Sequence, residues 1–259
     1  MTDDALRVTA LAKSYGGRPV LSDIDLAVRH GEFVALLGPS GAGKTTLFRC
    51  LTGLTAPDRG EIRGSRRGEA AFVFQQFNLV RRASALDNVL VGRLHATPTW
   101  RVLVRRFAKA DRQRALAALD EVGLLAVASQ RADRLSGGQQ QRVAIARVLA
   151  QGARILFADE PIASLDPTTA RTVLQTLRDV AHRDGIAVVC SLHQAELARE
   201  FADRIVGMKL GRFVFDVSAN DFGFSERDEL YAASSSVGPP IAEVALEIAT
   251  TNHRGRWLR

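Results

Sequence analysis

Short apolar segments alternate with helix-like patterns along most of the chain. Residues 33–37 form a continuous apolar run that ends in glycine and proline, which is typical of a strand buried in a parallel sheet. Residues 45–54 follow, with Leu47 and Leu51 four positions apart on one helix face. Strand-like runs return at 155–158, 186–190 and 204–208. This alternation predicts an α/β core built around a mostly parallel sheet.

The middle and the end of the chain interrupt the alternation. Helical patterns dominate from about residue 80 to 150, where we expect helices at 112–122, with Asp111 as the N-cap, and at 139–149. We therefore expect one domain over residues 1–231, with a helical lobe inserted in its core. Residues 232–259 begin with small, polar and proline-rich residues and predict a flexible C-terminal tail.

Composition narrows the class of protein only moderately. The 259 residues are 46% hydrophobic and carry a net charge of +7, which permits nucleic acid, anionic lipid or phosphate ligands without choosing among them. No run approaches the roughly 20 apolar residues that span a bilayer, so we expect a soluble protein that reaches a membrane only through a partner. Cys50 and Cys190 lack metal-ligand spacing and are expected to be buried free thiols in a reducing compartment.

A phosphate-binding loop follows the first buried run. The pattern G-x-x-x-x-G-K-[ST] is matched at every fixed position. Glycines let backbone N–H groups turn toward phosphate oxygens, and the following helix directs its positive end at the same anion. Lysine can reach the β- and γ-phosphates, and the hydroxyl after it can ligate Mg²⁺. The predicted ATP-binding residues are Gly38, Pro39, Ser40, Gly41, Ala42, Gly43, Lys44, Thr45 and Thr46.

Two carboxylates end the apolar run at 155–158. Asp159 is expected to hold Mg²⁺, directly or through water, and Glu160 to polarise the water that attacks the γ-phosphate. Adjacent acids at the end of a buried strand have no packing rationale, so beside a phosphate loop they predict ATP hydrolysis.

A second anion site is predicted 92 positions (136 − 44) after Lys44, where LSGGQQQR places Ser136, Gly137 and Gly138 at the start of a helix. An ordinary phosphate-loop enzyme does not need it. This string resembles the signature sequence of the ATP-binding cassette (ABC) family, and further family motifs match in order from about Leu6 to Tyr231.

The resemblance implies a role for each matching residue. Tyr15 matches the aromatic residue that stacks on adenine, and Gln75 matches the glutamine that contacts the metal and the attacking water; Gln76 is the alternative by eye. Asp166 belongs to a loop that crosses a dimer interface, and His193 matches a switch histidine at the γ-phosphate. The implied catalytic set is Glu160, His193, Gln75 and Lys44, and the implied Mg²⁺ ligands are Thr45, Gln75 and Asp159.

The family resemblance also implies an architecture and partners. It implies a P-loop core with a small antiparallel β lobe and a homodimer in which Ser136 and Gly138 of one copy close over ATP held by the other. It implies a membrane permease, an external binding protein reached indirectly, and a place on the cytoplasmic face of the inner membrane. Direct nucleic-acid binding is not expected. The short stretch 63–71 departs from the family pattern and predicts a trimmed lobe beside adenine.

Several strings, among them FQQFNLVRRASALDNVLVGRL and DEPIASLDP, closely resemble ATP-binding subunits of phosphonate importers. The basic cluster between Arg93 and Arg114, around Trp100, could then meet a permease, lipid headgroups or only water. Two alternatives stay open: an accessory subunit of a phosphonate-cleaving complex, and a nucleic-acid-associated cassette ATPase.

Overall fold

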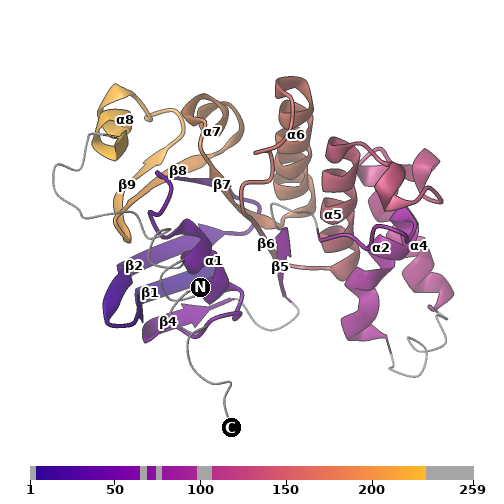
Figure 1. The fold of residues 1–259 in the computed structure, drawn as a ribbon, viewed down its shortest axis with the longest axis horizontal. Helices are drawn as coiled ribbons and strands as arrows, with labels where there is room; N and C mark the ends of the chain where they lie inside the picture. The colour runs from indigo at the N-terminus through magenta and orange to yellow at the C-terminus, as the bar shows by residue number, and fades with distance from the viewer. Residues whose placement is uncertain (1–3, 65–68, 74–77, 98–106, 232–259) are drawn as a thin grey trace, which may run out of the picture.

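The computed structural model describes residues 4–64, 69–73, 78–97 and 107–231, which fold into two sheets and several helices (Figure 1). The predicted α/β class with a mostly parallel sheet, a small antiparallel sheet and a helical insertion is confirmed. Gln75, Trp100 and the tail from residue 232 lie outside the described residues, as do parts of the basic cluster.

The larger sheet has the strand order β5-β6-β7-β3-β8-β9, parallel except for the last strand. Strand β3, between β7 and β8, is buried on both faces. Phe33, Ala35 and Leu37 enter one core cluster, while Val34 and Leu36 enter the other. This explains the unbroken apolar run, since alternate side chains point to opposite covered faces. The strands are β3 (Phe33–Leu37), β5 (Ala70–Val73), β6 (Ile155–Ala158), β7 (Ala187–Leu192), β8 (Arg204–Lys209) and β9 (Arg212–Ser218).

The smaller sheet is antiparallel, in the order β2-β1-β4, with β1 (Asp4–Tyr15), β2 (Arg18–Arg29) and β4 (Arg59–Arg63). Helix α1 (Lys44–Leu51) shares a core cluster with this sheet and with one face of the larger sheet. Within that cluster the ring of Phe48 packs against Phe157 at a centroid distance of 5.8 Å. The helix after the phosphate loop is thus fixed between the two sheets.

A group of helices lies between β5 and β6 in the sequence, and Figure 1 draws it to the right of these strands. It packs on the core through side chains of α5, such as Val143 and Ile145, which are fully buried. Its elements among the described residues are α2 (Ala85–Leu90), η1 (Val91–Ala96), α4 (Lys109–Glu121), η2 (Leu125–Val127), η3 (Ala132–Arg134) and α5 (Gly137–Gln151).

The predicted N-cap at Asp111 is wrong. Helix α4 begins at Lys109, its cap residue is Ala108, and Asp111 lies in the first turn. Its carboxylate instead accepts a hydrogen bond of 2.8 Å from Nε of Arg93, in a pair of largely buried side chains. One arginine of the basic cluster therefore stabilises the contact between η1 and α4, and is not presented to a ligand.

Three helices complete the core: α6 (Pro167–Asp184), α7 (Ala195–Phe201) and α8 (Phe224–Tyr231). The predicted cap of α6 is confirmed, because the Asp166 carboxylate accepts the N–H groups of Thr168 and Thr169, and Pro167 occupies the first helical position. Both cysteines are free and buried, as expected. Among the helices of the described part, none combines the length and apolar character that a membrane span requires.

Candidate active site

The phosphate loop connects β3 to α1 and is packed closely against β8. A Cβ at Gly38 would lie 2.4 Å from the carbonyl oxygen of Met208, so only glycine fits against β8. Gly43 has a φ of 108°, a conformation that side chains rarely adopt, immediately before the helix begins. The loop is also tied to the turn between β8 and β9, where the N–H of Gly211 donates to the carbonyl of Ala42 at 2.9 Å.

Lys44 is the first residue of α1 and is 5% exposed. Its Nζ donates to the carbonyls of Gly38 (2.6 Å) and Pro39 (3.1 Å), so the ammonium lies across the loop that precedes it. Burial lowers the pKa of Lys44, and the nearby carboxylates of Glu160 and Asp159 oppose that shift. A buried ammonium that lies across a phosphate loop is suited to binding the oxygens of a phosphate chain.

Asp159 follows β6, at the same edge of the sheet as the phosphate loop. The Oγ1 of Thr45 donates to Oδ2 of Asp159 at 2.9 Å, which joins the first turn of α1 to the end of β6. The other carboxylate oxygen accepts a 2.7 Å hydrogen bond from Oγ of Ser191. The structure therefore brings two of the predicted site residues, Thr45 and Asp159, together. The sequence patterns did not single out the serine that positions the carboxylate.

Ser191 lies in β7, the strand between β6 and β3, and is completely buried. Besides donating to Asp159, its Oγ accepts the backbone N–H of Glu160 at 2.8 Å. One hydroxyl thus orients both acidic residues. The available signal was a polar residue at the end of an apolar strand, two positions before His193.

Glu160 has a φ of 48°, a left-handed conformation that is uncommon for a residue with a side chain and costs about 1–3 kcal/mol. Its Oε1 lies 2.6 Å from Nε2 of His193, the first residue after β7. A cavity of about 80 Å³, with room for water, is lined by both side chains and by Ser191 and Leu165. This geometry suits a carboxylate that orients a water molecule.

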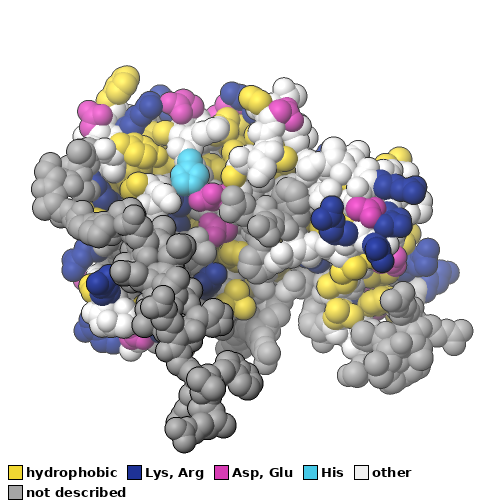
Figure 2. Space-filling model, viewed as in Figure 1, with side chains coloured by type: hydrophobic (Ala, Val, Ile, Leu, Met, Phe, Trp, Pro, Cys, Tyr) yellow, Lys and Arg dark blue, Asp and Glu magenta, His cyan; other side chains and the backbone are white. Residues whose placement is uncertain are grey.

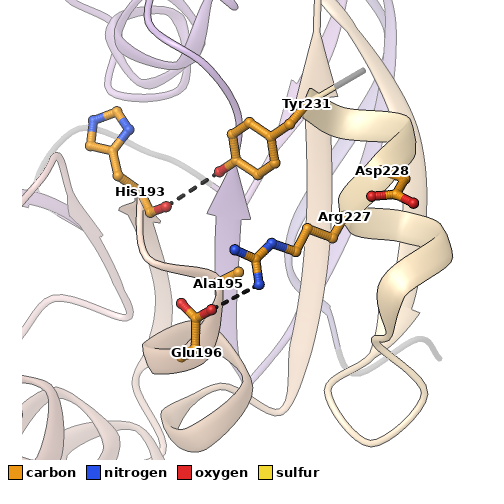
Figure 3. Close-up of a pocket in the computed structure, with 6 residues that line it drawn as sticks. All are labelled: His193, Ala195, Glu196, Arg227, Asp228 and Tyr231. Carbon is orange, nitrogen blue, oxygen red and sulfur yellow. Dashed lines mark hydrogen bonds and ion pairs between the residues drawn. The ribbon is translucent and has the colours of Figure 1, made fainter. Parts of the chain in front are cut away.

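His193 also borders a wider, open cavity of about 670 Å³ between α7 and α8 (Figure 3). The Tyr231 hydroxyl donates to the carbonyl of His193 at 3.3 Å, and Arg227 of α8 pairs with Glu196 of α7 at 2.9 Å. Helix α8 therefore supports the segment that carries the histidine. Figure 2 shows one face of the molecule, with a histidine beside acidic side chains near its centre.

The second predicted anion site lies at the start of α5. The Ser136 hydroxyl accepts the N–H of Gln139 at 3.3 Å, and the Gln139 side chain accepts the N–H of Ser136 at 2.9 Å, a capping box. Because Ser136 accepts in this arrangement, its hydroxyl proton is free for another acceptor. No hydrogen bond or ion pair within the described ranges joins residues 136–138 to the phosphate loop, and Figure 1 draws α5 and α1 on opposite sides of β5 and β6. One chain therefore leaves the two sites apart.

Tyr15 ends β1, and its side chain is 47% exposed. It is not joined to Asp159, Glu160 or His193, which follow strands of the other sheet. The described residues contain no group of three or more His, Cys, Asp and Glu side chains that could hold a metal by themselves. One hydroxyl and one carboxylate at Thr45 and Asp159 fit a Mg²⁺ ion whose remaining ligands are phosphate oxygens and water.

The fold and the site geometry define a P-loop nucleoside triphosphatase with an inserted helical region. The sequence profile of the ABC transporter family matches residues 21–163, more than half of the chain. The chain therefore belongs to the ABC transporter family and is its ATP-hydrolysing cassette.

Curated relatives extend the match to most of the chain. A "Hypophosphite import ATP-binding protein HtxD" of Stutzerimonas stutzeri is 53% identical over 245 residues, covering 89% of this chain and 72% of the relative. A "Phosphonates import ATP-binding protein PhnC" of Escherichia coli K12 is 46% identical over 252 residues, covering 90% of this chain and 96% of the relative.

Solved structures of a bacterial cassette, MJ0796, share the fold. Its dimeric structure matches with a TM-score of 0.70 and 32% identity, covering 85% of this chain and all of that one. A dimeric post-hydrolysis state of the same cassette, bound to ADP and Pi, matches with a TM-score of 0.68 at the same identity and coverage.

Proposed function

We propose that this chain energises the import of phosphonate or a related phosphorus oxyanion through a separate permease. The observation that carries the proposal is the pair of relatives named for hypophosphite and phosphonate import, at 53% and 46% identity over about nine-tenths of the chain. The oxyanion would not touch this chain, since a permease and a periplasmic or extracellular binding protein would select it. The chain itself would lie on the cytoplasmic face of the inner membrane.

ATP would bind along the loop 38–46, with its adenine against Tyr15. Lys44 is suited to the β- and γ-phosphates, because its buried ammonium is already held within the loop by two carbonyls. Mg²⁺, when bound, would neutralise phosphate charge, with Thr45, Asp159 and Gln75 as its protein ligands. The hydrogen bond between Thr45 and Asp159 supports this assignment for the two described ligands.

Glu160 would act as the base that orients the attacking water, assisted by Gln75. The support is its place beside the small cavity and the 2.6 Å contact between Glu160 and His193. His193 would leave that carboxylate for the γ-phosphate once nucleotide is present. A carboxylate and an imidazole that bind one another in the free chain are well placed to exchange partners in this way.

Two copies would form the working unit. Ser136, Gly137 and Gly138 would bind the ATP held by the other copy, and Asp166 would lie at the interface between copies. The separation of the two anion sites within one chain supports this arrangement, as does the dimeric form of MJ0796. ATP would then hold the dimer closed, and hydrolysis would open it and move the permease.

The test is the ATPase activity of the chain reconstituted in vesicles with its permease and binding protein. The vesicles are titrated separately with a phosphonate, hypophosphite, phosphite and phosphate. At least one of the reduced or carbon-bonded phosphorus compounds should stimulate ATP hydrolysis severalfold. Glu160→Gln should still bind ATP but lose the stimulated rate, roughly a hundredfold or more, because the water is no longer oriented by a carboxylate.

Three outcomes would contradict the proposal in different ways. Stimulation by none of the four compounds would remove the substrate class while leaving the ATPase intact. Near-normal hydrolysis by Glu160→Gln would remove Glu160 as the base. Co-purification with a soluble phosphonate-cleaving complex or with RNA, in place of a permease, would favour one of the two alternative functions.

A further inference from the structure

Asp58, just before β4, binds the end of β1 through both carboxylate oxygens and its backbone N–H. Its Oδ1 accepts a hydrogen bond of 2.7 Å from Nζ of Lys13, and its Oδ2 accepts the backbone N–H of Ser14 at 2.7 Å. Its own N–H donates to the carbonyl of Ala12 at 2.9 Å. One residue therefore binds three consecutive residues of the strand that ends in Tyr15.

Lys13, which is held by Asp58, in turn restrains the ring of Tyr15. The ammonium lies over the ring, 5.5 Å from its centroid, and the lysine side chain is only 14% exposed. The tyrosine itself is 47% exposed, so the ring retains open surface for a ligand. A cation on one face of an aromatic ring is attracted to it and restrains its position.

Apart from the backbone pairing of Tyr15 with Arg18 of β2, little of the described chain packs around this end of β1. The turn after Tyr15 consists of Gly16 and Gly17, both with positive φ, and a Cβ at either position would meet nothing within 4 Å. On the other side β1 pairs with β4, whose five residues are mostly exposed. Without side-chain contacts, the Tyr15 ring at the end of this strand would be free to change its orientation.

Asp58 and Lys13 both stay charged over the physiological pH range. The hydrogen bond from Lys13, followed by the N–H of Ser14, holds the pKa of Asp58 below its ordinary value. The hydrogen bond to Asp58 likewise raises the pKa of Lys13, against a smaller opposing effect of burial. The Asp58 side chain is 45% exposed, and an ion pair with an exposed partner contributes little to overall stability. The contact is therefore better explained by what it positions.

We propose that Asp58 and Lys13 are positioning residues of the adenine site, which hold the ring of Tyr15 ready to stack on the base of ATP. The proposal rests on the assignment of Tyr15 to adenine made above. Stacking on a ring that is already ordered binds the base more tightly, because less freedom is lost on binding. The contact would also compensate for the trimmed lobe beside adenine that the short stretch 63–71 predicts.

The experiment compares two ligands of the full-length chain by calorimetry, Mg-AMPPNP and inorganic triphosphate with Mg²⁺. Asp58→Ala should raise the Kd for Mg-AMPPNP about three- to tenfold, which is a fraction of the affinity that base stacking contributes. Lys13→Met should raise the same Kd about two- to threefold. The Kd for inorganic triphosphate should stay within about twofold, because that ligand has no base to stack. Glu61→Ala is the matched control, since it breaks an exposed ion pair with Arg63 on the neighbouring strand.

A double-mutant comparison separates positioning from a general structural effect. In a Tyr15→Ala background, Asp58→Ala should cause no further change in the Kd for Mg-AMPPNP. Equal weakening of both ligands, or additive effects of the two substitutions, would overturn the proposal. Unchanged affinity in Tyr15→Ala alone would instead remove the adenine role of Tyr15, and with it the basis for the positioning role.

Discussion

Ser191 is the residue on which the geometry of the acidic site depends. It is fully buried, and its hydroxyl hydrogen-bonds both Asp159 and the main chain of Glu160. The left-handed backbone at Glu160 is held by this hydrogen bond together with the contact to His193. A strained residue of this kind persists only where its surroundings determine it, and strain of this sort gathers at functional sites.

Ser191→Ala should therefore lower kcat for ATP roughly tenfold or more, the usual effect of removing a partner that orients a metal ligand. The Mg²⁺ concentration needed for half-maximal activity should rise in the same variant, because Asp159 loses the donor that orients it. ATPase rates across a Mg²⁺ titration measure both effects. Ser22→Ala, in β2 of the other sheet, is the control. Wild-type Mg²⁺ dependence with wild-type kcat would exclude the positioning role.

At the scale of elements, the start of α5 is packed directly on the start of α6. A Cβ at Gly138 would lie 2.1 Å from Cγ2 of Thr169, whereas one at Gly137 would meet only the end of the Leu165 side chain at 3.2 Å. Thr169 is itself bound to the Asp166 cap through its N–H. The predicted second anion site is thus packed closely against the predicted interface loop and the first turn of α6.

Gly138→Ala should lower the free energy of unfolding by about 1–3 kcal/mol through overpacking, although alanine is the better helix former. The double variant that combines Gly138→Ala with Thr169→Ser should recover most of this loss, because serine keeps the hydroxyl and removes the clashing methyl. Chemical denaturation of both variants, with Thr169→Ser and Gly137→Ala as references, measures the effect. A double variant no more stable than Gly138→Ala would show that the methyl contact is not the cause.

At the scale of the whole molecule, Arg204 joins the two sheets. From β8 its Nε donates to Glu32 at 2.7 Å and one terminal nitrogen donates to Asp216 of β9 at 2.8 Å. The other terminal nitrogen donates to the carbonyl of Ala27 in β2. The antiparallel sheet, with Tyr15, is in this way held to the parallel sheet that carries the phosphate loop.

Arg204→Met should lower the free energy of unfolding by about 3 kcal/mol, because it leaves the largely buried Glu32 without its cation. Arg171→Met breaks an exposed pair with Glu200 and should cost less than about 1 kcal/mol. Urea titration of the two variants gives the comparison. A loss in Arg204→Met no larger than in Arg171→Met would indicate that the network does not join the sheets energetically.

Much of the fold and part of the candidate site followed from local patterns. The run 33–37, the loop that leads into α1 and the Asp166–Pro167 start of α6 each depend on neighbours within a few positions. The helix expected at 112–122 was placed less well, because Asp111 pairs with the distant Arg93 and does not cap the helix. The family resemblance supplied the expected roles of Tyr15, Gln75 and His193, which the residues alone did not carry.

The sequence by itself determined the class of this protein, because a phosphate loop, adjacent carboxylates and a second anion motif are each encoded within a short run of consecutive residues. Only the tertiary structure decided what holds those motifs in place. Ser191 meets Asp159 across 32 positions, Asp58 meets Lys13 across 45, and Arg204 meets Glu32 across 172. The physical reason is that strand pairing, and not sequence distance, brings such side chains together, and local periodicity carries no record of that pairing.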